Sequence, residues 1–183
     1  LPISKLHQGV ALSCGDLMTH DLDEFIEGLP GKGRQLLIAM DQVEDPQNLG
    51  AVIRSAAFLG AMGLISLKKH AAPLSATVSK VSAGSLEHFP MIQVGNLSES
   101  LLGLKKEGFI IAGAAGDAEA IPFHEMPLTE RMVLVMGNEG QGLRNLTRRR
   151  CDFLIRIPGN EAVESLNVSA AASILIHHLV MSN

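Results

Sequence analysis

The sequence predicts an α/β fold in which helices flank a mostly parallel sheet. Strand-length apolar runs recur along the chain with helical patterns between them, which is the order that such folds require. Most of the runs are continuously apolar, as is typical of strands buried on both faces of a parallel sheet. The runs cover residues 36–40, 63–67, 91–94, 109–112, 132–136 and 153–157.

Helices are predicted where apolar residues recur every three or four positions. Their ranges are about 48–60, 74–81, 97–104 and 166–181. Residues 1–33 mix Pro, Gly, His and acidic residues, and only a short helix near residues 21–27 is expected there. The chain therefore divides into a connector, residues 1–33, and one globular domain, residues 34–183.

The composition is that of a folded, aliphatic protein, with 46% hydrophobic and 19% charged residues and no Trp or Tyr. The formal net charge is −4, so binding to nucleic acid would depend on a local basic patch. Arg144 and the run Arg148–Arg150 form one candidate patch. Such a run also fits a solvated helix end.

Several classes of site are not expected. Cys14 and Cys151 are far apart and no Cys/His ligand spacing occurs, so we expect no metal site. Two lone thiols fit a reducing cytosol, and no signal peptide or long apolar run suggests export or a membrane. No GxGxxG follows a strand, so a nucleotide-like cofactor would have to be held in another way.

The first candidate loop, residues 41–50, leaves the carboxyl end of a predicted buried strand, where open α/β sheets bind ligands. Asn48 is well placed as the N-cap of the next helix. Arg54 lies four residues after Gly50, so the two share a helical face, and the glycine would leave room for a ligand beside the guanidinium. A capped helix with a surface arginine explains the same pattern.

The second loop, residues 136–143, also follows a buried strand and holds three glycines that allow close backbone approach. The Glu139 carboxylate could accept hydrogen bonds from a ribose or a base. The alternative is a glycine-rich turn whose glutamate caps the next helix.

The third loop leads through residues 157–160 and 164–169 into the last helix, with Ser165 or Asn167 as its N-cap. The small residues 169–173 that follow would let a backbone or a planar ligand pack closely.

Together the loops resemble the SpoU family of RNA ribose 2′-O-methyltransferases, within the SPOUT superfamily. The pattern is DPxNxGxxxR, then GNEGxGL, then IP followed by SLNVSxA, over about residues 35–181. The resemblance implies an S-adenosylmethionine-dependent enzyme with a C-terminal trefoil knot that holds the cofactor. It also implies a homodimer whose active site lies near the subunit interface. Knots are rare, and nothing in the spacing here shows one.

The resemblance assigns two sets of site residues. The catalytic positions are Asn48, Arg54, Glu139, Ser165 and Asn167. The cofactor-binding positions are Ala114, Gly137, Asn138, Ile157 and Leu166. Ala114 stands where many relatives have Thr, so a hydroxyl contact is lost there. Because a guanidinium does not readily give up a proton, we hypothesise that Arg54 binds the adjacent phosphate and stabilises the oxyanion.

The expected substrate is RNA. Residues 6–9, Leu-His-Gln-Gly, resemble the segment that follows an amino-terminal RNA-binding domain in bacterial large-subunit rRNA guanosine 2′-O-methyltransferases. We therefore expect residues 1–33 to be a connector from such a domain, absent here, and a guanosine of 23S rRNA to be the target. Methylation of tRNA and a non-catalytic role in RNA binding or ribosome assembly are the alternatives. A hydrolase is not expected, because no GxSxG occurs.

Overall fold

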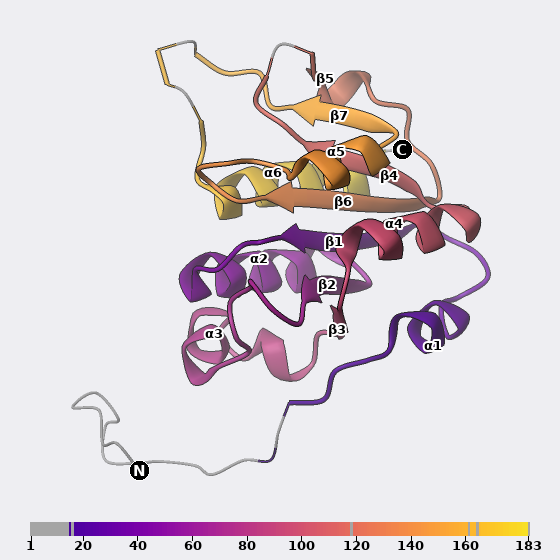
Figure 1. Ribbon diagram of the computed structural model, residues 1–183, viewed down its shortest axis with the longest axis vertical. Helices are drawn as coiled ribbons and strands as arrows, with labels where there is room; N and C mark the ends of the chain where they lie inside the picture. Colours follow the sequence, from indigo (N-terminus) through magenta and orange to yellow (C-terminus); the bar gives the residue numbers. More distant parts are fainter. Residues whose placement is uncertain (1–14, 16, 118, 161, 164, 183) are drawn as a thin grey trace.

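A seven-stranded sheet forms the centre of the computed structural model, which describes residues 15, 17–117, 119–160, 162–163 and 165–182. The strand order is β3-β2-β1-β6-β4-β7-β5, and all paired strands are parallel (Figure 1). The predicted fold class is confirmed. The strands are β1 (Gln35–Asp41), β2 (Gly63–Leu67), β3 (Met91–Val94), β4 (Ile110–Ala114), β5 (Ile121–Pro122), β6 (Arg131–Gly137) and β7 (Phe153–Arg156).

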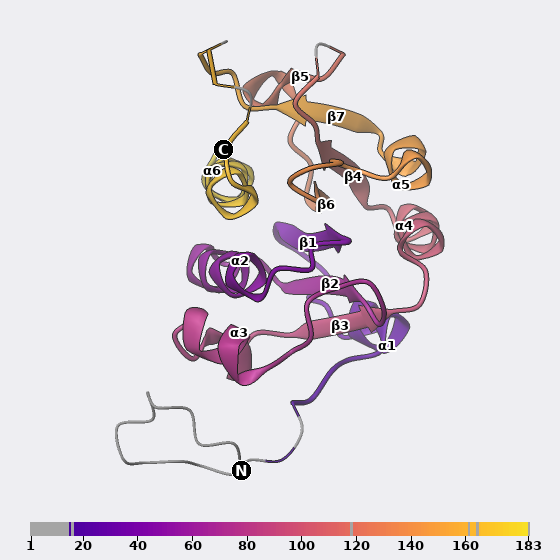
Figure 2. The same cartoon turned by 60° about the vertical axis from the view of Figure 1, so that its left-hand side comes forward.

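Helices cover both faces of this sheet (Figure 2). One face carries α2 (Pro46–Leu59), α3 (Ala76–Val81) and α6 (Val168–Met181); the other carries α1 (Leu22–Glu27), α4 (Leu97–Lys106) and α5 (Asn145–Arg150). Two short 3-10 turns, η1 (Ser85–Glu87) and η2 (Phe123–Glu125), complete the set. In β1, Leu36 and Ile38 pack on the α2 side whereas Leu37 and Ala39 pack on the α4 side, so a strand without polar alternation is buried on both faces.

The start of α2 differs from the prediction. Asp45 is the N-cap, accepting a 2.9 Å hydrogen bond from the Gln47 N–H, and Pro46 is the first helical residue. Proline suits that position because it has no N–H to satisfy. The prediction that Asn48 caps the helix is therefore wrong; Asn48 lies in the first turn and is buried.

The central strands β1 and β6 pair along seven residues, from Gln35 opposite Arg131 to Asp41 opposite Gly137. On the outer side of β6, β4 pairs with it and β7 pairs with β4. Because all of these strands are parallel, the segments that follow β1, β6, β4 and β7 leave the same edge of the sheet. The three candidate loops are among them.

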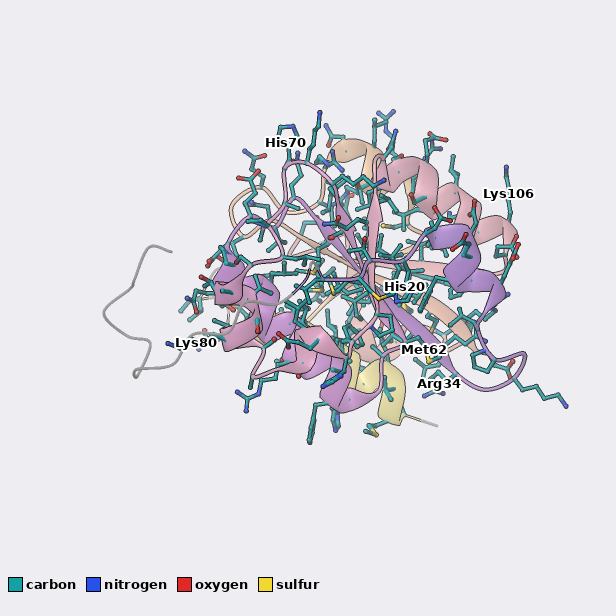
Figure 3. The ribbon with its side chains drawn as sticks, turned by 90° about the horizontal axis from the view of Figure 1, so that it is seen from below. His20, Arg34, Met62, His70, Lys80 and Lys106 are labelled. Atoms are coloured by element: carbon teal, nitrogen blue, oxygen red, sulfur yellow. The ribbon has the colours of Figure 1, made fainter. Side chains whose placement is uncertain are left out.

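The last helix, α6, returns to pack beside α2 and is fixed at both ends (Figures 1 and 2). At its C-terminal end the Arg34 guanidinium donates to the carbonyls of Leu179 (3.2 Å), Val180 (2.9 Å) and Ser182. Figure 3 shows Arg34 beside this end of the helix. A cation there satisfies carbonyls that lack helical partners and complements the helix dipole. The knot implied by the resemblance stays a prediction.

The predicted connector is only partly covered by the structure. Residues 6–9, which carried the resemblance to a linker, lie outside the described residues. The described part of residues 1–33 includes the expected short helix, α1. The origin of this segment in a preceding RNA-binding domain stays a prediction. Across the described residues, no helix has the length and apolar character needed to span a membrane.

Candidate active site

Three side chains from the three candidate loops meet at the carboxyl edge of the sheet. The amide nitrogen of Asn167 donates to Asn48 Oδ1 at 2.9 Å and to Glu139 Oε1 at 2.5 Å. Glu139 Oε1 also accepts from the backbone N–H of Val168 at 3.2 Å. The structure thus brings Asn48, Glu139 and Asn167 into one polar cluster, whose members are far apart in the sequence.

Asn167 links this cluster to α6 because it is the N-cap of that helix, one of the two residues predicted for that role. Its Oδ1 accepts from the N–H groups of Ser169 (2.9 Å) and Ala170 (3.4 Å) and from the Ser169 hydroxyl. Since these partners are donors, the oxygen must face the helix and the amide nitrogen must face Asn48 and Glu139. The cap therefore fixes the orientation of the amide.

Glu139 lies at the N-terminus of α6, where a carboxylate is stabilised by the helix dipole and by free N–H groups. The alternative that this glutamate caps the next helix along the chain is wrong, because the helix whose N–H it accepts is α6 and not α5. A carboxylate with one oxygen held in this way still has acceptor sites for a bound hydroxyl or cation.

The glycine-rich loop folds tightly on itself. Asn138 and Gly142 exchange two backbone hydrogen bonds, of 3.1 and 2.8 Å. A Cβ at Gly137 would lie 2.3 Å from the carbonyl carbon of Gly142, so only glycine fits there. The Asn138 side chain donates to the Gln42 carbonyl at 3.0 Å and accepts from the Gly140 N–H at 2.9 Å. These side-chain contacts stabilise the loop itself.

Arg54 lies apart from the polar cluster. It is exposed and borders an open hollow of about 870 Å³, lined also by Ser55, Phe58, Gly84 and His88 among others. Within the described part of the chain it makes no hydrogen bond or ion pair. Arg54 therefore remains available to a ligand.

The interpretation of Gly50 is corrected by the structure. A Cβ at this position would lie 2.7 Å from the Cβ of Val81, so the missing side chain lets α3 approach α2. The space beside Gly50 is filled by protein and is not left for a ligand.

The remaining predicted residues surround the same edge. Ala114 ends β4 and pairs with Ile155 of β7, and Ile157 follows β7 and packs against the core. Ser165 and Leu166 are exposed just before the α6 cap. No contact of Ser165 with the polar cluster is seen among the described residues.

Most of the candidate arginine patch is engaged within the protein. Arg144 pairs with Asp41, Arg148 with Asp117 and Glu119, and Arg150 with Glu99. Arg149 is exposed. These arginines join α5 to neighbouring segments, so the run is mainly a structural feature.

Two titratable groups near the site show clear shifts. The hydrogen bond from Arg148 lowers the pKa of Asp117, in the segment after β4. Burial raises the pKa of the Cys151 thiol to about 12, which keeps it protonated at neutral pH. Over the residues that the structure covers, no group of three or more His, Cys, Asp or Glu side chains is arranged to hold a metal ion.

Sequence reasoning missed the pair of Asp41 and Arg144. Asp41 ends an apolar strand and is fully buried, and its carboxylate accepts from the Arg144 Nε at 2.6 Å and the Arg144 N–H at 2.9 Å. An ionisable residue that ends a buried strand was the available signal, but its partner 103 positions away could not be read from the pattern.

Similar proteins carry the same architecture. The chain is 42% identical over 177 residues to the 23S rRNA (guanosine-2′-O-)-methyltransferase RlmB of Photobacterium profundum, covering 95% of this chain and 71% of that protein. The SpoU methyltransferase AviRb from Streptomyces viridochromogenes, solved with the cofactor AdoMet, matches with a TM-score of 0.76 and 29% identity over 84% of this chain and 60% of that one.

The A. aeolicus TrmH/SpoU tRNA modifying enzyme matches with a TM-score of 0.73 and 29% identity, covering 86% of this chain and 80% of that one. The family model described as the SpoU rRNA Methylase family matches residues 35–177, which include all three loops and the polar cluster. The chain therefore belongs to the SpoU rRNA methylase family.

Proposed function

We propose that this protein is an S-adenosylmethionine-dependent methyltransferase that modifies ribose 2′-hydroxyls in RNA. The observation that carries the proposal is the Asn48–Asn167–Glu139 cluster, built at the ligand-binding edge of a parallel sheet in a member of the SpoU family. A small-molecule hydrolase would need a nucleophile with an adjacent base, and the cluster holds only amides and a carboxylate.

The donor set at this edge fits S-adenosylmethionine. Glu139 offers a carboxylate for hydroxyl or cationic groups. Ala114 and Gly137 end neighbouring strands and Ile157 follows a third, so their backbone groups lie at the same edge of the sheet. Asn138 and Leu166 would border the same space. When bound, the cofactor supplies a methyl group on a positively charged sulfur.

Arg54 is the residue we assign to the RNA. A 2′-hydroxyl attacks poorly until its proton is removed, and the resulting oxyanion needs stabilisation. The guanidinium remains charged, so Arg54 binds the adjacent phosphate and stabilises the oxyanion, while that phosphate or water accepts the proton. The open hollow beside Arg54 gives the RNA backbone access to it.

A homodimer is the second part of the proposal. In the described chain Arg54 does not contact the polar cluster, and apolar side chains are exposed on α6, away from the hollow beside Arg54. Ile174 is 40% exposed and Met181 is 56% exposed. A second copy would cover this surface. Light scattering should give twice the chain mass, and Met181→Glu should lower it; a monomeric wild type would contradict the dimer.

The favoured target is a guanosine in 23S rRNA, the large-subunit ribosomal RNA, modified in the cytoplasm. The similarity to a protein named for that reaction supports this choice. A tRNA target is the alternative, supported by the similarity to a tRNA modifying enzyme. A non-catalytic role on the same fold is disfavoured because Asn48 and Arg54 are both present.

Two measurements test the function. Thermal unfolding with S-adenosylmethionine, its demethylated product, NAD and ATP should show stabilisation by the first two alone. Methyl transfer from labelled cofactor to 23S rRNA fragments and to tRNA, with mapping of the modified nucleotide, then identifies the substrate. No stabilisation at saturating S-adenosylmethionine, or no label in any RNA, would overturn the proposal.

A further inference from the structure

Asp41 lies beside both ends of the glycine-rich loop. At one end, Asp41 is the register partner of Gly137, the last residue of β6. At the other end, the Asp41 carboxylate accepts two hydrogen bonds from Arg144, at 2.9 Å from its N–H and 2.6 Å from its Nε. We infer that Asp41 is a positioning residue that holds Glu139 at the start of α6.

Burial of the Asp41 carboxylate makes its hydrogen bonds from Arg144 important for stability. Asp41 has no solvent exposure, and a buried carboxylate is stable only when it is paired and hydrogen-bonded. Here each carboxylate oxygen accepts a hydrogen bond, one of them from a guanidinium, and charge-assisted bonds are the stronger class. Removing the negative charge leaves Arg144 without this partner and frees one end of the loop.

Contacts inside the loop carry the constraint to its tip. The Asn138 side chain donates to the carbonyl of Gln42, the residue after Asp41, and Gln42 has a left-handed backbone with φ of 59°. The two backbone bonds between Asn138 and Gly142 then close the base of the loop. Only residues 139–141 project beyond this closure.

The projecting tip reaches α6 through Glu139. Its Oε1 accepts from the Val168 N–H at 3.2 Å and from the Asn167 side chain. A continuous series of contacts therefore runs from Asp41 through Arg144 and the loop to the first turn of α6. Its effect on catalysis rests on the proposed function, whereas its effect on α6 does not.

The test compares Asp41→Asn with Asp152→Asn, a control that removes a paired carboxylate elsewhere in the fold, where the side chain is 31% exposed. Asp152 has the same kind of partners, the ammonium of Lys105 at 2.7 Å and the N–H of Ile111 at 2.8 Å, but these partners belong to α4 and to the start of β4, away from the candidate loops. Hydrogen exchange of the full chain without ligands is the first readout. S-adenosylmethionine affinity and single-turnover methylation are the second.

We expect Asp41→Asn to speed amide exchange about tenfold or more in residues 137–144 and in residues 168–170, since a hydrogen bond to a charged group is lost. Asp152→Asn should leave both segments unchanged. Faster exchange in the loop without a change at residues 168–170 would overturn the inference, as would equal effects of the two variants. If Asp41→Asn does not fold, Arg144→Gln removes the same ion pair from its exposed side.

A double-mutant cycle separates positioning from general destabilisation. If Asp41 acts through Glu139, Asp41→Asn adds little to the loss of turnover already caused by Glu139→Gln. Multiplicative losses in the double variant would show that Asp41 acts independently and would overturn the inference. A wild type that methylates no RNA contradicts the proposed function alone, because the exchange measurement still tests Asp41.

Discussion

The side-chain amides of Asn48 and Asn167, 119 positions apart, are joined by a 2.9 Å hydrogen bond that ties the first turn of α2 to the N-cap of α6. The same Asn167 nitrogen also binds Glu139. The donor end of one side chain thus holds the cluster together, while its acceptor end caps the helix.

Asn167→Asp separates these two roles. Aspartate keeps the cap, since it accepts from the Ser169 N–H, but it replaces the donor with an oxygen that faces Glu139. We expect S-adenosylmethionine affinity and turnover to fall about tenfold or more, and thermal stability to fall at neutral pH through repulsion between the two carboxylates, although the cap is kept. Asn167→Ala should lose the cap as well, at about 1 kcal/mol. Calorimetry and melting curves distinguish the two; equal activity of Asn167→Asp and wild type would contradict this role.

Gly137→Ala should destabilise the protein, because its Cβ would collide with the backbone of Gly142 and Leu143. The expected loss is about 1–3 kcal/mol, or about 3–10 °C in Tm. Gly140→Ala is the control, since its Cβ would meet only Asn138 Oδ1 at 3.7 Å. Similar melting temperatures for the two variants would show that the close approach at Gly137 does not matter.

Arg54→Lys tests the planar fork of the guanidinium. Lysine keeps the positive charge but cannot bind a phosphate in the same bidentate way, so turnover on RNA should fall about tenfold or more while S-adenosylmethionine affinity stays unchanged. Arg149→Lys, at an exposed position in α5, serves as the control. Near-normal turnover of Arg54→Lys at neutral pH would contradict the proposed role.

Cys151 should resist alkylation in the native protein. With a pKa of about 12, only about one thiol in ten thousand is ionised at pH 8. In a Cys14→Ser variant, native Cys151 should therefore react with iodoacetamide about a thousandfold more slowly than after unfolding in guanidinium chloride. Rapid labelling of the native variant would contradict the burial of this thiol.

The ion pair of Asp117 and Arg148 should make a small, pH-dependent contribution to stability. The hydrogen bond from Arg148 lowers the folded-state pKa of Asp117, so the unfolded chain binds the proton more readily. The contribution is present above about pH 4, the unfolded value, and is lost as the pH falls through the lower folded value. Because both side chains are partly exposed, it is at most about 1 kcal/mol.

Melting curves of wild type and Asp117→Asn between neutral and strongly acidic pH measure this contribution. The difference in Tm should be at most about 4 °C at pH 7 and should shrink toward zero below about pH 4. A difference that does not change with pH would show that the carboxylate charge plays no part.

The sheet could be predicted because most of its strands are continuously apolar, as is typical of strands that are buried on both faces of a parallel sheet. The two-residue strand β5 was missed because it is too short to form an apolar run. The N-cap of α2 was misplaced because Asn48 is a common capping residue, whereas Asp45 followed by Pro46 was the stronger signal.

The site was less accessible to sequence reasoning because its contacts join distant segments. Spacing alone cannot show that Asn48 meets Asn167; the resemblance to a family brought them together. The error at Gly50 has the same origin, since the neighbour that fills the space, Val81, belongs to another helix. The acidic partners of the arginine run could not be predicted either, because they too belong to distant segments of the chain.

The position of α6 also has a consequence for synthesis. Asn48 leaves the ribosome early in synthesis. Its partner Asn167 is the N-cap of α6 (Val168–Met181) and emerges much later. A nascent chain can form the β1–α2–β2 part of the sheet before the polar cluster exists. We expect binding of S-adenosylmethionine to appear only when α6 has docked, so a nascent chain that stops before α6 would bind no cofactor.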